Sequence, residues 1–280
     1  MADPGTLLIL CRMVVFGAAL MIWGAALFRW RLTPDAAPLP PERVLPVALL
    51  AALAAQLPVE VARIAGDWSA ATDPGMVLSV IGLTSPGQAW LVQALAAIAL
   101  IIARQRQSLR GQLLGGLLLM AGLSMTGHAA ASGGMAGLLR QVNHVLHLAA
   151  AGAWIGALPH VLCLLRRMPD AAASAVLMRY SGEGHFWVAL VLLTGLAAML
   201  WTVGGLPLDW VAPYQALLSA KIAVVAAMVG LALRNRYVIV PRLRERPDGL
   251  AAIARATRSE IALGLIAAAL VAWLATLDPH

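Results

Sequence analysis

The chain has 280 residues, of which 61% are hydrophobic and only 12% carry charge. Soluble domains carry charge at about 25% of their positions, so this composition excludes a water-soluble globular protein. The basic excess, 20 Lys and Arg against 13 Asp and Glu, is divided among short clusters between apolar blocks. Because the cations form no long patch, we expect no nucleic-acid partner.

Apolar blocks of about 20 residues recur along the chain, and this is the length that a helix needs to cross about 30 Å of hydrocarbon. A β-barrel would show alternation over about 10 residues instead. The sequence therefore predicts an all-α, polytopic transmembrane bundle that forms a single domain over 1–280. The eight predicted spans are 6–28, 44–64, 84–104, 110–128, 141–165, 185–204, 213–234 and 259–277.

The third span has an apolar stretch upstream of it, at 75–83, which ends in the sequence Thr-Ser-Pro-Gly at 84–87. Proline and glycine interrupt regular helices, and the stretch is too short to cross a bilayer by itself. We expect a short outer-surface helix or a re-entrant turn there, not a ninth span.

Arginine placement predicts the orientation, because loops rich in Lys and Arg remain in the cytoplasm. Sixteen of the 20 cations follow spans one, three, five and seven. This pattern predicts that both termini face the outside, which is the periplasm if the host is a Gram-negative bacterium. The sixteen are Arg29, Arg31, Arg43, Arg104, Arg106, Arg110, Arg166, Arg167, Arg179, Arg234, Arg236, Arg242, Arg244, Arg246, Arg255 and Arg258.

Histidines supply the first candidate site. His144 and His147 open the fifth span, and their i, i+3 spacing puts both imidazoles on one helical face. His128 ends the fourth span at the same predicted level, with Met125 or Met120 before it. Imidazole suits copper and zinc, whereas thioether sulfur selects Cu(I), so this mixture indicates an outer copper site. Haem b with two axial histidines, or ordinary polar packing without any metal, would also fit.

A second candidate group lies at the opposite depth. His160 and Cys163 end the fifth span and His185 begins the sixth, so the three could form an inner metal site. On a straight helix, position 160 is rotated by about 220° from position 147, so the outer and inner groups do not share one stripe. The alternative is a buried cysteine with two histidines at a helix interface.

Three charged groups lie several residues inside the predicted spans, away from their ends, where an unpaired charge is costly. Arg12 and Glu60 lie at similar predicted depths, and we expect a structural ion pair between them. Lys221, the only lysine in the chain, lies seven residues into the seventh span. It could neutralise a polar site, oppose the passage of cations or bond to helix carbonyls.

From the fourth span onward, the sequence resembles the copper resistance D (CopD) family of bacterial inner-membrane proteins. Five segments in a fixed order carry the resemblance. They are GHA at 127–129, NHVLHLAAAGAWIGAL at 143–158, RYSGEGHFWVALVLLTG at 179–195, PYQALLSAK at 213–221 and RNRYVIVPRL at 234–243.

The resemblance implies eight spans and movement of copper from periplasm to cytoplasm, beside a small periplasmic copper-binding partner of the CopC type. The positions that match the family's pattern are His128, His147, Trp154, Tyr214 and Lys221. We therefore expect a copper importer, not an enzyme, with copper ion as its ligand. The alternative is a haem-binding redox protein. No GxxxxGK[ST] loop is present, so ATP-driven transport by this chain is not expected.

Overall fold

A computed structural model describes residues 3–126, 133–167, 170–240 and 249–277. Every regular element in these ranges is a helix, which confirms the predicted all-α bundle. The helices are α1 (Pro4–Leu32), α2 (Pro40–Ala65), α3 (Pro74–Leu83), α4 (Ser85–Gln105), α5 (Leu109–Ser124), α6 (Gly134–Ala151), α7 (Leu158–Arg167), α8 (Asp170–Val203), α9 (Pro213–Arg234) and α10 (Gly249–Leu274). Shorter elements are the 3-10 helix η1 (Trp68–Thr72) and the π-helical segments η3 (Gly152–Gly156) and η4 (Asn235–Ile239).

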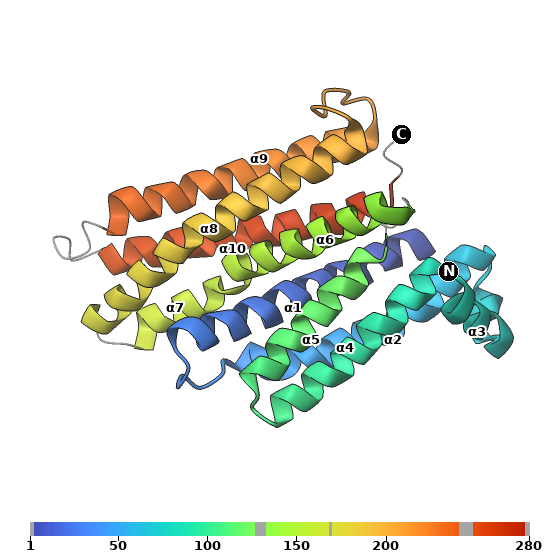
Figure 1. Cartoon of the computed structure of the whole chain (residues 1–280), viewed down its shortest axis with the longest axis horizontal. Coiled ribbons are helices and arrows are strands. Elements are labelled where there is room, and N and C mark those ends of the chain that lie inside the picture. Colours follow the sequence, from blue (N-terminus) through green and yellow to red (C-terminus); the bar gives the residue numbers. More distant parts are fainter. Residues whose placement is uncertain (1–2, 127–132, 168–169, 241–248, 278–280) are drawn as a thin grey trace.

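Within the described ranges, seven helical stretches are long and apolar enough to cross a membrane, so the chain is a multi-pass membrane protein. The longest, Gly134–Arg167, joins α6, η3 and α7. The predicted fourth span, 110–128, corresponds to α5, whose 16 residues extend only about 24 Å at 1.5 Å per residue. An eighth membrane crossing therefore stays a prediction, although α5 lies along α4 within the bundle (Figure 1).

The short helix predicted near 75–83 is present as α3. Thr84 ends α3 and also begins α4, because its hydroxyl accepts a hydrogen bond from the Gly87 amide at 3.1 Å. This cap starts a new helix immediately after the old one has ended, which is why the apolar stretch divides into two elements.

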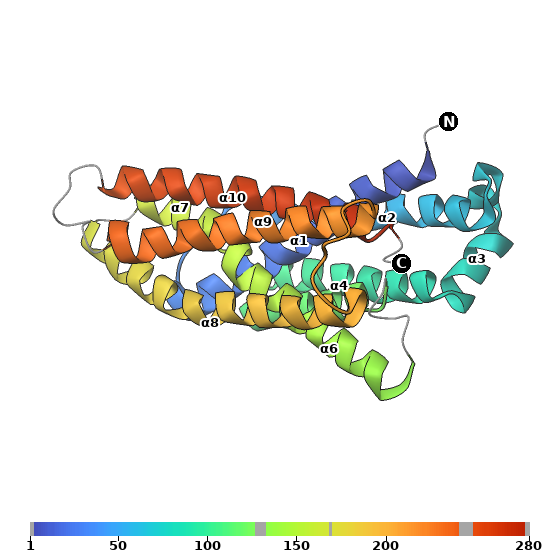
Figure 2. The ribbon, with the colours of Figure 1, turned by 90° about the horizontal axis from the view of Figure 1, so that it is seen from above.

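The two ends of the bundle differ in charge. The last turns of α1, α4, α7 and α9 carry arginines, and they gather at the end opposite the start of α1 and the end of α10 (Figure 1). Figure 2 shows α3 at the same end of the bundle as the start of α1 and the end of α10. The start of α1 and the end of α10 therefore lie at the same end of the bundle.

A close crossing between α1 and η3 holds the centre of the bundle together. Gly24 lies so near the η3 backbone that a Cβ atom there would overlap it, and a Cβ at Gly156 would overlap the Leu20 carbonyl. Beside this crossing, the Trp23 indole donates a hydrogen bond to the Ala149 carbonyl at 2.9 Å. Small residues that let two backbones approach are the usual means of packing helices in membranes. The crossing fixes η3, which carries Trp154, at the middle of the bundle.

Candidate functional site

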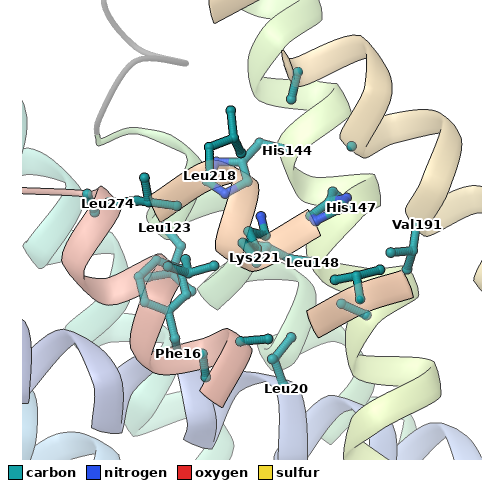
Figure 3. Close-up of a pocket in the computed structure, with 18 of the residues that line it drawn as sticks. Phe16, Leu20, Leu123, His144, His147, Leu148, Val191, Leu218, Lys221 and Leu274 are labelled. Carbon is teal, nitrogen blue, oxygen red and sulfur yellow. The ribbon is translucent and has the colours of Figure 1, made fainter. Parts of the chain in front are cut away.

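A cavity of about 260 Å³ lies among α1, α6, α8, α9 and α10, and it contains both histidines of the predicted outer pair. His144 and His147 enter it from α6, one helical turn apart, and Lys221 enters it from α9 (Figure 3). The face predicted from the i, i+3 spacing is therefore the face that lines the cavity.

The surroundings of His147 fix which ring nitrogen is available. Its Nδ1 lies 2.9 Å from the hydroxyl oxygen of Thr194, and that hydroxyl donates its own proton to the Leu190 carbonyl at 2.5 Å. The Thr194 oxygen must then accept, so the proton of the imidazole resides on Nδ1. This leaves the lone pair of Nε2 for a metal, which is the usual way in which a hydrogen bond sets the tautomer of a liganding histidine.

His144 offers a second donor atom. Its Nδ1 is buried and has no hydrogen-bond partner among the described residues. A buried polar atom without a partner costs about 1–3 kcal/mol, and a bound ligand would remove this penalty. Both imidazoles thus have a nitrogen free to bind within one cavity.

The thioethers that line the cavity are not the predicted ones. Met120 is completely buried in the core that α1, α4 and α5 share, and Met125 caps the end of α5 without lining the cavity. Met199 of α8 and Met228 of α9 line it instead. Met228 follows Lys221 by seven residues, or two turns, so the two lie on one face of α9. This spacing could have predicted from the sequence that Met228 lines the cavity. His128, the third predicted imidazole, lies outside the described residues.

The described lining of this cavity is cationic. Lys221, Arg12 and Arg140 contribute to it, and no Asp or Glu of the described residues does. Arg12 donates to the Ala275 carbonyl at 2.7 Å, whereas Glu60 pairs with Arg63 at 2.6 Å. The expected Arg12–Glu60 ion pair is therefore absent, because one turn along α2 gives Glu60 a nearer guanidinium.

A second cavity, of about 310 Å³, lies on the other side of Trp154. Trp154 lines both cavities, so the two adjoin at this residue. The polar residues around the second cavity include Tyr180, His185, Asn235 and Glu260. This cavity lies nearer to the arginine-rich end, where α8 begins and α9 ends (Figure 1).

The structure does not bring the predicted inner ligands together. His160 turns toward α1 and α2, where its Nε2 lies 3.0 Å from Glu42 and its ring lies 5.5 Å from that of Phe28. His185 instead lies in the second cavity, with Nε2 2.9 Å from the Tyr237 hydroxyl. Cys163 is half-buried and has no disulfide.

No three His, Cys, Asp or Glu side chains of the described chain form a group that could hold a metal. The separation of His160 from His185 has a physical reason. Glu42 also pairs with Arg29 at 3.2 Å, so the imidazole of His160 is bound in a buried cluster with these two charged residues.

Comparisons with known proteins decide the class. Residues 1–138 match the family model of the copper resistance protein D-like N-terminal domain, and residues 174–274 match that of copper resistance protein D. The chain is 34% identical over 235 residues to inner membrane protein YebZ of Escherichia coli (strain K12), across 80% of this chain and 79% of that protein. It is 31% identical over 311 residues to copper resistance protein D of Pseudomonas syringae pv. tomato, across 100% of this chain and 98% of that one. The chain belongs to the copper resistance protein D family.

No solved structure matches this CopD family chain. The two family models and the two relatives confirm the family resemblance drawn from the five sequence segments. Both cavities are lined mainly by helices within or adjoining the second matched region, 174–274.

The haem alternative finds no support in the described geometry. Axial ligands approach an iron from opposite sides of the haem plane, usually from facing helices. His144 and His147 both project from α6, and the facing partner that the alternative requires, His128, lies outside the described residues.

Proposed function

We propose that this CopD family protein carries copper from the periplasm to the cytoplasm across the bacterial inner membrane, and that His144 and His147 form its outer binding site. The observation that carries the proposal is that both imidazoles line one cavity with a ring nitrogen free to bind. Copper is here the transported substrate.

The chemistry of the cavity favours a soft cation. Two imidazole nitrogens, with the thioethers of Met199 and Met228 in the same lining, form a donor set that suits Cu(I) better than Mg²⁺ or Ca²⁺, which prefer oxygen. Protons compete with metal for imidazole, so we expect copper loading to weaken as the pH falls.

The proposed direction follows from the charge of the two ends. The arginine-rich end faces the cytoplasm under the positive-inside rule, so the end with the start of α1 and the end of α10 faces the periplasm. The histidines of α6 lie toward that outer end and the second cavity toward the inner one. Copper would then pass from one cavity to the other at Trp154.

The copper donor is proposed to be a small periplasmic protein of the CopC type. The relative from Pseudomonas syringae is named for copper resistance, and the relative from Escherichia coli is named an inner membrane protein. Mixing such a copper-loaded donor with the purified CopD family chain would test this, with transfer of the metal as the supporting result.

Metal analysis of the purified protein tests the binding site. Wild-type protein should retain one copper ion, and His144→Ala with His147→Ala should reduce retention and uptake into proteoliposomes at least tenfold. The matched control is His185→Ala, which removes an imidazole from the other cavity and should leave outer-site copper unchanged. Equal copper content in the double variant and the wild type would refute the assignment. A strong Soret band from the wild type would favour haem instead.

A further inference from the structure

Glu260 is a buried carboxyl group in the wall of the second cavity. Its residue is only 4% exposed. The amide Nδ2 of Asn235 donates to its Oε1 at 2.6 Å, and the indole of Trp154 donates a second hydrogen bond to the side chain. Both donors are neutral, and none of the ion pairs in the described chain includes Glu260.

Two π-helical segments converge on this carboxyl group. Trp154 belongs to η3 and Asn235 is the first residue of η4. Single π turns within α-helices are rare and occur frequently at functional sites. The Tyr180 hydroxyl also donates to the Trp154 carbonyl at 2.7 Å, so α8 fastens the same turn. One carboxyl group of α10 therefore contacts both η3 and η4, the segment that follows α9.

A further polar atom at this place lacks a partner. The Oδ1 atom of Asn235 is buried and accepts no hydrogen bond from the described residues. Since its Nδ2 is engaged with Glu260, this oxygen is free to accept a proton donor or a cation in the cavity. The site thus presents carboxyl and amide oxygens, and among the described residues no cation is paired with them.

The charged and titratable groups around Glu260 have other contacts. Arg236 of η4 bonds the Met178 carbonyl at 3.5 Å, and Lys221 of α9 lines the first cavity. On α8, Tyr180 bonds to the Trp154 carbonyl and His185 to Tyr237, and His160 of α7 is bound to Glu42. The arginines of α1 are bound elsewhere: Arg12 to Ala275, Arg29 to Glu42 and Arg31 to Glu183. Within the described chain, Arg234 of α9 and Arg255 and Arg258 of α10 form no ion pair with Glu260.

We propose that Glu260 is a proton-binding site and that copper entering the second cavity displaces this proton. An ionised carboxylate in a membrane-embedded cavity is costly unless a cation accompanies it. A proton meets this requirement when the cavity is empty, and copper meets it when the cavity is filled. One positive charge replaces another for Cu(I), so the site stays neutral and the released proton leaves through the cavity.

This inference rests on the proposed copper transport but can be tested apart from it. In proteoliposomes containing a pH-sensitive dye, uptake of Cu(I) by the wild type should be accompanied by proton movement. Glu260→Gln retains a side-chain oxygen to accept from Trp154 and Asn235 but has no acidic proton. In this variant, copper-driven proton movement should fall at least tenfold, whereas copper bound at the histidine pair should be unchanged.

The matched control is Glu183→Gln, the same substitution at an acidic residue of α8 that pairs with Arg31. Proton movement should persist there at the wild-type level. Persistence of copper-driven proton movement in Glu260→Gln would overturn the proposal. Failure of the wild type to bind copper would instead contradict the proposed function and leave the next measurement to decide on the proton site.

Trp154 provides a second measurement that needs neither copper nor transport. Because its indole donates to Glu260, a change in the charge of the carboxyl group should change the tryptophan fluorescence. The wild type should show a pH-dependent fluorescence component that is absent from Glu260→Gln and from Trp154→Phe. Identical fluorescence–pH curves for the wild type and both variants would contradict proton binding at Glu260.

Discussion

Lys221, together with Arg12 and Arg140, gives a positive charge to the lining of the cavity that holds the two histidines. It enters this cavity from α9, and the described lining supplies no carboxylate to balance it. A cation at His144 and His147 must therefore bind against a neighbouring positive charge. This charge lowers the affinity of the cavity for any cation. Only a metal that bonds strongly to imidazole and thioether groups overcomes the repulsion, so Lys221 is suited to limit which metals occupy the site.

Removing this charge should strengthen copper binding. Lys221→Leu keeps an apolar side chain at this position but removes the ammonium group, and unlike methionine it adds no thioether that could itself bind copper. Unit charges several Å apart interact by on the order of 1–3 kcal/mol at an effective dielectric constant near 20, so copper affinity should rise by about tenfold or more. Competition with a chelator of known affinity would measure it. Lys221→Arg should behave like the wild type, and equal affinity in all three proteins would contradict this role.

Glu42 should matter for stability more than its place at a helix start suggests. It lies 3.2 Å from Arg29 and 3.0 Å from His160, and all three are buried. Glu42→Gln leaves the Arg29 charge buried without its counter-ion, which typically costs about 3–5 kcal/mol of unfolding free energy. Unfolding in detergent micelles should show this loss. Glu183→Gln, which breaks the more exposed pair with Arg31, should cost far less.

At the residue scale, the sequence predicted the histidine pair because two positions three apart must share a helical face. It did not predict Glu42 or Glu260 as central groups, since each stands near the edge of an apolar block and there resembles an ordinary interfacial acid. Their burial depends on which neighbouring helix covers them. Neither hydropathy nor spacing contains that information.

At the element scale, α1 crosses η3 so closely that the contact positions leave no room for a Cβ atom. Gly24→Ala would place a methyl group into the backbone of Gly152 and Gly156. Forcing extra volume into such a contact costs about 1–3 kcal/mol, and separating the helices would also disturb the indole of Trp154. Thermal unfolding should show the loss for Gly24→Ala. Gly17→Ala on the same helix, where a Cβ meets nothing within 4 Å, should be neutral or stabilising, and equal effects of both substitutions would refute this account.

Helix positions were predictable from hydropathy, whereas the π-helical segments were not. The predicted fifth span, 141–165, is one apolar run, yet the structure divides it into α6, η3 and α7. A π turn keeps the apolar composition and changes only the register of the side chains. Register decides that His147 enters the first cavity while His160 faces Glu42, and this is why the inner site could not be placed from spacing alone.

At the scale of the whole molecule, the account requires both ends of the chain to lie on the periplasmic side. Alkaline phosphatase fused after residue 280 should be active, because this enzyme folds only in the periplasm, and a fluorescent protein fused there should be dark. Fusions after residue 240, in the arginine-rich region, should give the opposite result. An active phosphatase at both positions would contradict an even number of crossings with arginines inside.

The central claim is that the cavity between α6, α8, α9 and α10 binds copper through His144 and His147. Anomalous scattering at the copper absorption edge, recorded from crystals of the copper-loaded protein, tests this most directly. The account predicts one anomalous peak within bonding distance of His147 Nε2 and of an imidazole nitrogen of His144. A peak elsewhere in the bundle, or copper that remains bound without either ring as a ligand, would contradict it.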